Sequence, residues 1–163
     1  MTSSNDLFVQ MALKAWNGQV SLADKFFASV SDEQMLTEIA PGRNRIIYIL
    51  GHLIAVHDNL IALLGLGDRL YQSYDEPFLK SPDKSGLTLP DVVTLRADWQ
   101  RSNEILKNYF VNLTAEEWLA RHNAMSDEDW QKDPARNKLS VLLSRTNHLA
   151  YHFGQLQLVN KPT

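Results

Sequence analysis

The chain has 163 residues, a formal net charge of −3, ordinary proportions of hydrophobic (44%) and charged (21%) residues, and no cysteine. This length and balance suit one globular domain spanning residues 1–163. The mild negative charge, with no basic stripe, argues against nucleic-acid binding, and the lack of cysteine excludes disulfides, thiolate nucleophiles and cysteine-based zinc sites.

The first predicted element is a long helix near the N-terminus. Apolar residues recur at helical spacing between Leu7 and Phe27, and Asn5 or Asp6 is the expected N-cap. Gly18 weakens this helix, but no proline interrupts it before the break at residues 40–42, Ala-Pro-Gly.

A second helix is predicted from about Asn44 to Leu64. It is apolar around most of its circumference, which is typical of a helix deep in a bundle. The stretch also contains His52, His57 and Asp58, which would lie in hydrocarbon if it spanned a membrane, at a cost on the order of several kcal/mol. A buried helix is therefore expected, with no contact with a membrane.

Residues 68–89 are predicted to form a long crossover loop because prolines and a glycine are scattered through them. A loop of this length in a compact domain is often the lid or wall of a site. The third helix is expected from about Pro90 to Val111, with Pro90 in its first turn.

Residues 112–117 combine a helix stop with a capping box that starts a short helix. A polar stretch follows as far as Pro134, and the last helix is predicted from about Lys138 to Val159. Since no strand-like alternation is visible, the sequence predicts an all-α four-helix bundle with the long crossover loop between its second and third helices.

The last helix carries His148 and His152 at positions i and i+4. This spacing places the two side chains about 40° apart around the helix and about 6 Å apart along it, so both can reach one ion. Leu149 stands where zinc proteases carry a glutamate, so the pair is not that signature. Two ligands are fewer than a stable site needs, and histidines satisfied by hydrogen bonds in a cleft are the alternative.

His52 in the second helix is the candidate third ligand. It lies at the edge of the apolar arc, and Gly51 beside it would let a neighbouring helix approach. His57 is about 140° further around the helix, so it cannot easily share an ion with His52, and a structural role is expected for it. His122 lies in the polar stretch and is expected to be exposed to solvent.

The segments Gly51-His52-Leu53 and His148-x3-His152-x-Gly154-Gln155-Leu156 together resemble the DinB-like (YfiT-related) superfamily. The resemblance covers nearly the whole chain and includes the length, the helices and the long second connection. It implies a site for one divalent metal ion that is built from three histidines, His52, His148 and His152. Leu149 and Ala150 depart from the charged residues common in the family, but these positions face away from the expected site.

Three neutral imidazoles leave coordination positions open for water or substrate, which supports hydrolysis or delivery of a thiolate. The resemblance implies a metal-dependent hydrolase or thiol (S-)transferase that acts on a small molecule, and any thiol would come from a low-molecular-weight cosubstrate. Zinc or nickel is the expected ion, with iron or copper as alternatives. The competing interpretations are a metal- or ligand-binding bundle without turnover and a purely structural bundle, so enzymatic activity is left open.

Three further residues are candidates for contacts around the ion. Arg145, one turn from His148, could bind an anionic group or extend along the bundle surface. Tyr48, one turn before His52, could donate a hydrogen bond or merely pack. Gln155 could hold a histidine tautomer or serve helix packing.

The expected partners are a small-molecule substrate and a second copy of the chain. The resemblance implies a homodimer. Trp99, Trp118 and Trp130 are surplus aromatic residues that suit either a dimer surface or the core and its rim. A cytoplasmic location is expected, because residues 1–6 show no secretory signal and the chain has no cysteine.

Overall fold

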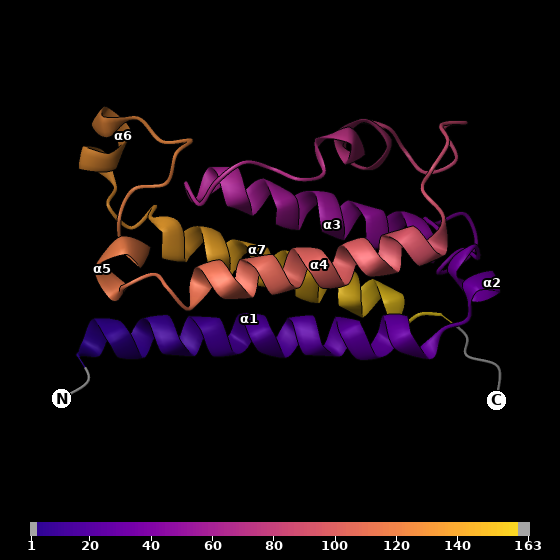
Figure 1. Ribbon diagram of the computed structural model, residues 1–163, viewed down its shortest axis with the longest axis horizontal. Coiled ribbons are helices and arrows are strands. Elements are labelled where there is room, and N and C mark those ends of the chain that lie inside the picture. The colour runs from indigo at the N-terminus through magenta and orange to yellow at the C-terminus, as the bar shows by residue number, and fades with distance from the viewer. Residues whose placement is uncertain (1–2, 160–163) are drawn as a thin grey trace.

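The computed structural model describes residues 3–159, and over that range its regular elements are helices, with two isolated bridges and no strand. The long helices α1, α3, α4 and α7 lie side by side, with the short helices at the ends and flanks (Figure 1). The predicted all-α fold is confirmed. The α-helices are α1 (Ser4–Ser29), α2 (Asp32–Met35), α3 (Ile46–Leu63), α4 (Val92–Phe110), α5 (Ala115–Trp118), α6 (Asp127–Lys132) and α7 (Lys138–Leu156).

Helix α1 begins earlier than predicted. Ser3, not Asn5 or Asp6, is the N-cap: its hydroxyl accepts the Asp6 N–H, and the Asp6 carboxylate accepts the Ser3 N–H in return. This reciprocal capping box satisfies two N–H groups that a helix start would otherwise leave without partners. Gly18 lies within the helix and does not interrupt it.

Helix α3 is the centre of the bundle. Thirteen of its eighteen residues are buried, and nine of these belong to two hydrophobic clusters that also contain residues of α1, α4 and α7. By length and composition α3 could cross a membrane, but two-thirds of it is buried inside the protein. Its length and apolar composition are therefore those of a core helix, and the prediction of a buried helix is confirmed.

The connection between α3 and α4 is long because of the direction of the two helices. Helices α3 and α4 run in the same direction, opposite to α1 and α7 (Figure 1), so the chain must return along the bundle before α4 begins. The predicted loop is partly helical, with a 3₁₀ turn η1 (Gln72–Tyr74) and a π turn η2 (Glu76–Lys80) packed along α3. The connection is a wall of the bundle.

The later helix boundaries differ from the predicted ones by a few residues. Asp91 caps α4 by accepting the Thr94 N–H, so Pro90 precedes the cap and does not occupy the first turn. Helix α7 ends at Leu156, before the predicted Val159. The capping box that starts α5 is confirmed. Helix α6 was not predicted. None of its residues is buried, so no apolar periodicity in the sequence indicated it.

The tryptophans are placed mostly in the interior. Trp99 is 2% exposed and Trp118 is 0% exposed, each within a core cluster, while Trp130 on α6 is half-buried. Trp99 and Trp118 are therefore core residues and provide no dimer surface. The homodimer and the cytoplasmic location stay predictions.

Candidate metal centre

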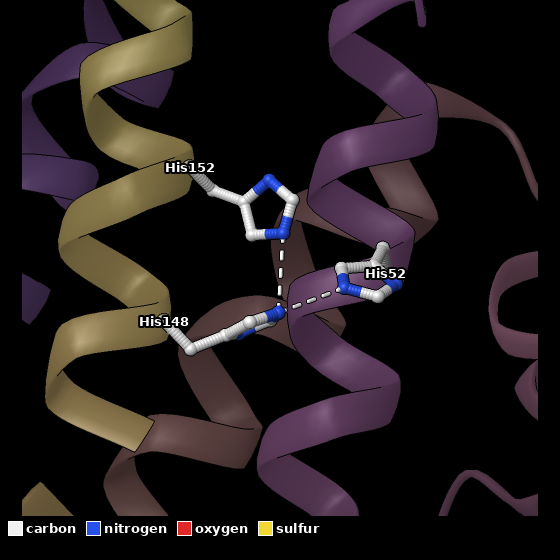
Figure 2. A group of neighbouring side chains, drawn as sticks. All are labelled: His52, His148 and His152. Atoms are coloured by element: carbon white, nitrogen blue, oxygen red, sulfur yellow. Dashed lines mark hydrogen bonds between the residues drawn. The ribbon is translucent and has the colours of Figure 1, made fainter. Parts of the chain in front are cut away.

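The fold brings together the three histidines that the sequence singled out. His52 extends from α3, and His148 and His152 extend from successive turns of α7, so that their rings converge between the two helices (Figure 2). The Nε2 atom of His148 lies 3.2 Å from Nε2 of His52 and 3.2 Å from Nε2 of His152. One nitrogen from each ring falls within 4.8 Å of the others.

The outer nitrogens of two rings are held by acceptors. His52 Nδ1 lies 2.9 Å from the Phe78 carbonyl oxygen, and His152 Nδ1 lies 2.8 Å from Oε1 of Gln155. Because each partner is an oxygen acceptor, each Nδ1 carries the proton and donates it, which leaves Nε2 as a lone pair directed into the site. Gln155 is itself oriented, since its Nε2 donates to the Tyr151 hydroxyl at 2.9 Å.

This arrangement fits a divalent cation. With neutral rings, His52 and His152 each present an unprotonated Nε2, and a proton on His148 Nε2 could be shared with at most one of them in a good hydrogen bond. An ion accepts all three lone pairs at once. Tetrahedral zinc, with Zn–N bonds of about 2.0–2.1 Å, separates its nitrogen ligands by about 3.3 Å, close to the two 3.2 Å separations seen here. Three imidazoles equally suit nickel, copper or iron.

The three histidines have lowered pKa values, which leave their lone pairs available to a cation. Burial, with the charge of the neighbouring histidines, lowers the pKa of His148 and of His152 to about 4. Burial also lowers the pKa of His52. At neutral pH the three rings are therefore uncharged, and protons do not compete for their lone pairs.

Tyr48 lies against the connection. Its hydroxyl donates to the Ser81 carbonyl at 2.7 Å, and burial raises its pKa. Its ring packs against that of Phe78, with centroids 5.8 Å apart. Tyr48 therefore fastens the connection to α3, and its hydroxyl is used there.

The two remaining histidines stand outside the site. His57 is buried between Trp16 and Trp99, with ring centroids 4.7 and 5.0 Å away, and its Nδ1 lies 3.0 Å from Oδ1 of Asn103. Burial lowers its pKa to about 3, so it is a neutral packing residue, as expected.

The expectation that His122 is exposed is wrong, because this residue is only 8% exposed. The segment around it folds back onto the bundle, where the Asn123 N–H donates to the Leu63 carbonyl and the Lys138 N–H to the Ala120 carbonyl. Polar composition alone gave no sign of this packing.

The role of Phe78 beside Gly51 was not predicted from the sequence. Gly51 was expected to admit a neighbouring helix, but it admits the Phe78 ring from the connection: a Cβ on Gly51 would lie 2.2 Å from two atoms of that ring. Phe78 is fully buried, and its carbonyl oxygen holds His52. The one available signal was a glycine directly before the histidine.

Gly51→Ala should therefore destabilise the protein. The new methyl group must displace a ring that has no room to move, so we expect a loss of about 1–3 kcal/mol in the free energy of unfolding, measured by urea denaturation of the metal-free protein. Zinc affinity should fall as well, since the Phe78 carbonyl would shift. Gly18→Ala is the matched control, because nothing lies within 4 Å of its Cβ, and it should gain up to about 1 kcal/mol. A Gly51→Ala variant as stable as the wild type would contradict the close packing.

Gln155→Leu should weaken zinc binding about 10- to 100-fold while leaving the fold intact, because the leucine cannot accept the His152 Nδ1–H and the ring loses its fixed tautomer. Competition with a chromophoric chelator measures the change. Gln157→Leu, at an exposed position just beyond α7, controls for the loss of an amide and should bind zinc as the wild type does. Equal affinities for the two variants would show that Gln155 does not orient His152.

Fold and site together define a helical bundle with a candidate three-histidine metal centre between two facing helices. The family model described as the DinB superfamily matches residues 16–156, a range that includes His52, His148 and His152. The chain belongs to the DinB superfamily. A comparison with curated proteins found no match.

Proposed function

We propose that this chain is a metal-dependent enzyme, a hydrolase or thiol (S-)transferase, that acts on a small molecule through one divalent ion held by His52, His148 and His152. The observation that carries the proposal is the convergence of three Nε2 atoms, two of them in rings whose Nδ1 is already committed to an oxygen acceptor. Membership of the DinB superfamily supports it.

The ion, zinc or nickel in this proposal, would supply Lewis acidity that polarises a carbonyl and favours the deprotonated form of water or of a thiol. The residues of the chain have positioning roles. Gln155 and the Phe78 carbonyl fix the two rings that they contact, and the three histidines leave coordination positions for a substrate. Because the chain has no cysteine, a transferase would take its thiol from a low-molecular-weight cosubstrate.

The test compares the metal-loaded protein, the metal-free protein and His148→Ala in two assays. One assay follows hydrolysis of p-nitrophenyl acetate. The other follows transfer of the thiol of free cysteine, added as the cosubstrate, to 1-chloro-2,4-dinitrobenzene. Turnover that requires the ion and disappears in His148→Ala supports an enzyme, and the active assay indicates the reaction class. A protein that holds the ion but shows no metal-dependent rate in either assay would favour the alternative, a metal-binding bundle without turnover.

A further inference from the structure

A cavity of about 460 Å³ lies between α3, α7 and the segment that follows α5. Apolar side chains, including Val56 and Leu63, form much of its wall, and Asn59, Asn123 and Arg145 add polar groups. The Asn123 amide donates to a backbone carbonyl of α3, whereas the Asn59 side chain makes no hydrogen bond within residues 3–159. The cavity therefore offers an apolar body with a free amide and a cation.

Two residues of the cavity wall each lie about one helical turn from a histidine of the site. On α3, Val56 follows His52 by four residues, and on α7, Arg145 precedes His148 by three. Residues at these spacings are neighbours on one helix face, with Cβ atoms about 5–6 Å apart. A small molecule bound at the histidines could therefore extend one helical turn into this cavity.

The charge of Arg145 has no partner among residues 3–159. Its Nε is buried without an acceptor, and no carboxylate of residues 3–159 lies within ion-pairing distance of its guanidinium. By contrast, Arg45 pairs with Asp83, and Arg69 pairs with Asp58 and Asp75. A guanidinium stays protonated throughout the physiological pH range, and leaving one of its buried N–H groups without an acceptor is costly.

The positive charge of Arg145 also affects the pKa of the histidines. The Arg145 cation is among the groups that lower the pKa of His52 and His148, although burial is the larger cause for both. The spacing along α7 supports the same placement, because Arg145 and His148 are neighbours on one helix face. An anion that neutralised the guanidinium would be near the metal position as well.

We propose that Arg145 binds a carboxylate of the substrate in this cavity, while the reacting end of the same molecule lies at the three histidines. The planar guanidinium matches the two carboxylate oxygens and can donate to both. The substrate class is a small acid in which a short apolar linker, suited to the wall of Val56 and Leu63, joins the carboxylate to the reacting atom. This inference rests on the proposed function, because it takes the histidines to be the reacting end of the site.

The test uses cobalt-loaded protein and two thiols that differ in one group. Both 3-mercaptopropionate and 3-mercapto-1-propanol offer a sulfur to the ion, but only the first carries a carboxylate. Titration followed by the cobalt–thiolate absorption should show about tenfold tighter binding of the acid, the effect expected for a charge-assisted hydrogen bond. Arg145→Gln should abolish this preference, whereas Arg145→Lys should keep part of it.

Arg43→Gln is the matched control, since it removes the same charge at an exposed position without a side-chain partner among residues 3–159, and it should keep the full preference. Cobalt content is measured for every variant. If cobalt binds but the acid is not preferred, or the preference survives in Arg145→Gln, this inference is overturned and the proposed metal function stands. If the wild type holds no cobalt, zinc or nickel, the proposed function fails and this inference falls with it.

Discussion

His148→Ala should abolish stoichiometric metal binding. Wild-type protein purified without chelator and offered zinc or nickel should hold close to one ion per chain, measured by elemental analysis after gel filtration. His148 Nε2 lies 3.2 Å from the nitrogens of both other rings, so its loss leaves two imidazoles on different helices, fewer ligands than a stable site needs. Loss of a hydrogen-bond partner of a ligand lowers metal affinity about 10–100-fold. Loss of the ligand His148 itself should lower the affinity for the ion further.

His122→Ala is the control for this experiment. It makes the same chemical change at a histidine that is also largely buried but lies outside the three-histidine group, so it should keep one ion per chain. Far-ultraviolet circular dichroism establishes that both variants are folded. Either of two results would contradict the metal proposal. One is a wild-type protein that stays metal-free when offered both ions, and the other is a His148→Ala variant that still holds one ion per chain.

Asp58→Ala should produce the largest loss of stability, about 3–5 kcal/mol in the free energy of unfolding, the range for breaking a buried charge pair. The Asp58 carboxylate is fully buried and accepts from the backbone N–H groups of Leu70 and Tyr71 and from Nε of Arg69, at 2.7, 3.0 and 3.0 Å. Alanine would leave these donors without their acceptor. Arg69 would keep only Asp75.

Urea denaturation of the metal-free protein measures this loss. Asp68→Ala removes a carboxylate from an exposed position in the same connection and should change stability by less than about 0.5 kcal/mol. Asp58→Asn preserves the shape and part of the hydrogen bonding, so it should fall between the two. An Asp58→Ala protein within about 1 kcal/mol of the wild type would mean that the buried carboxylate does not hold the connection.

The connection matters for the site because it is fastened to the helix that carries His52. Asp58 holds its start, Gly51 receives the Phe78 ring, and Tyr48 donates to the Ser81 carbonyl. All three contacts are made by α3. Since the Phe78 carbonyl fixes the tautomer of His52, loosening this wall should weaken the metal site even where no ligand is changed.

Local patterns in the sequence predicted the features that depend on neighbouring residues. Helical periodicity identified the four long helices to within a few residues, and the i, i+4 spacing placed His148 and His152 on one face, because one helix turn determines both. Where periodicity was missing, prediction failed: α6 buries no residue, and the burial of His122 depends on contacts with α3 that polar composition does not reveal.

The meeting of His52 and His148, which are 96 residues apart, was expected from the sequence only through a family resemblance. No local pattern determines it, because it depends on how α3 packs against α7. The sequence by itself determined the all-α class, the main helices and one half of the histidine site. Only the tertiary structure decided that Phe78 and Gln155 orient two of the rings, that Tyr48 fastens the connection to α3, and that Arg145 faces a cavity with no counter-charge from the described part of the chain. Each of these contacts depends on the packed positions of whole side chains and segments, which hydrophobic spacing along a helix leaves open.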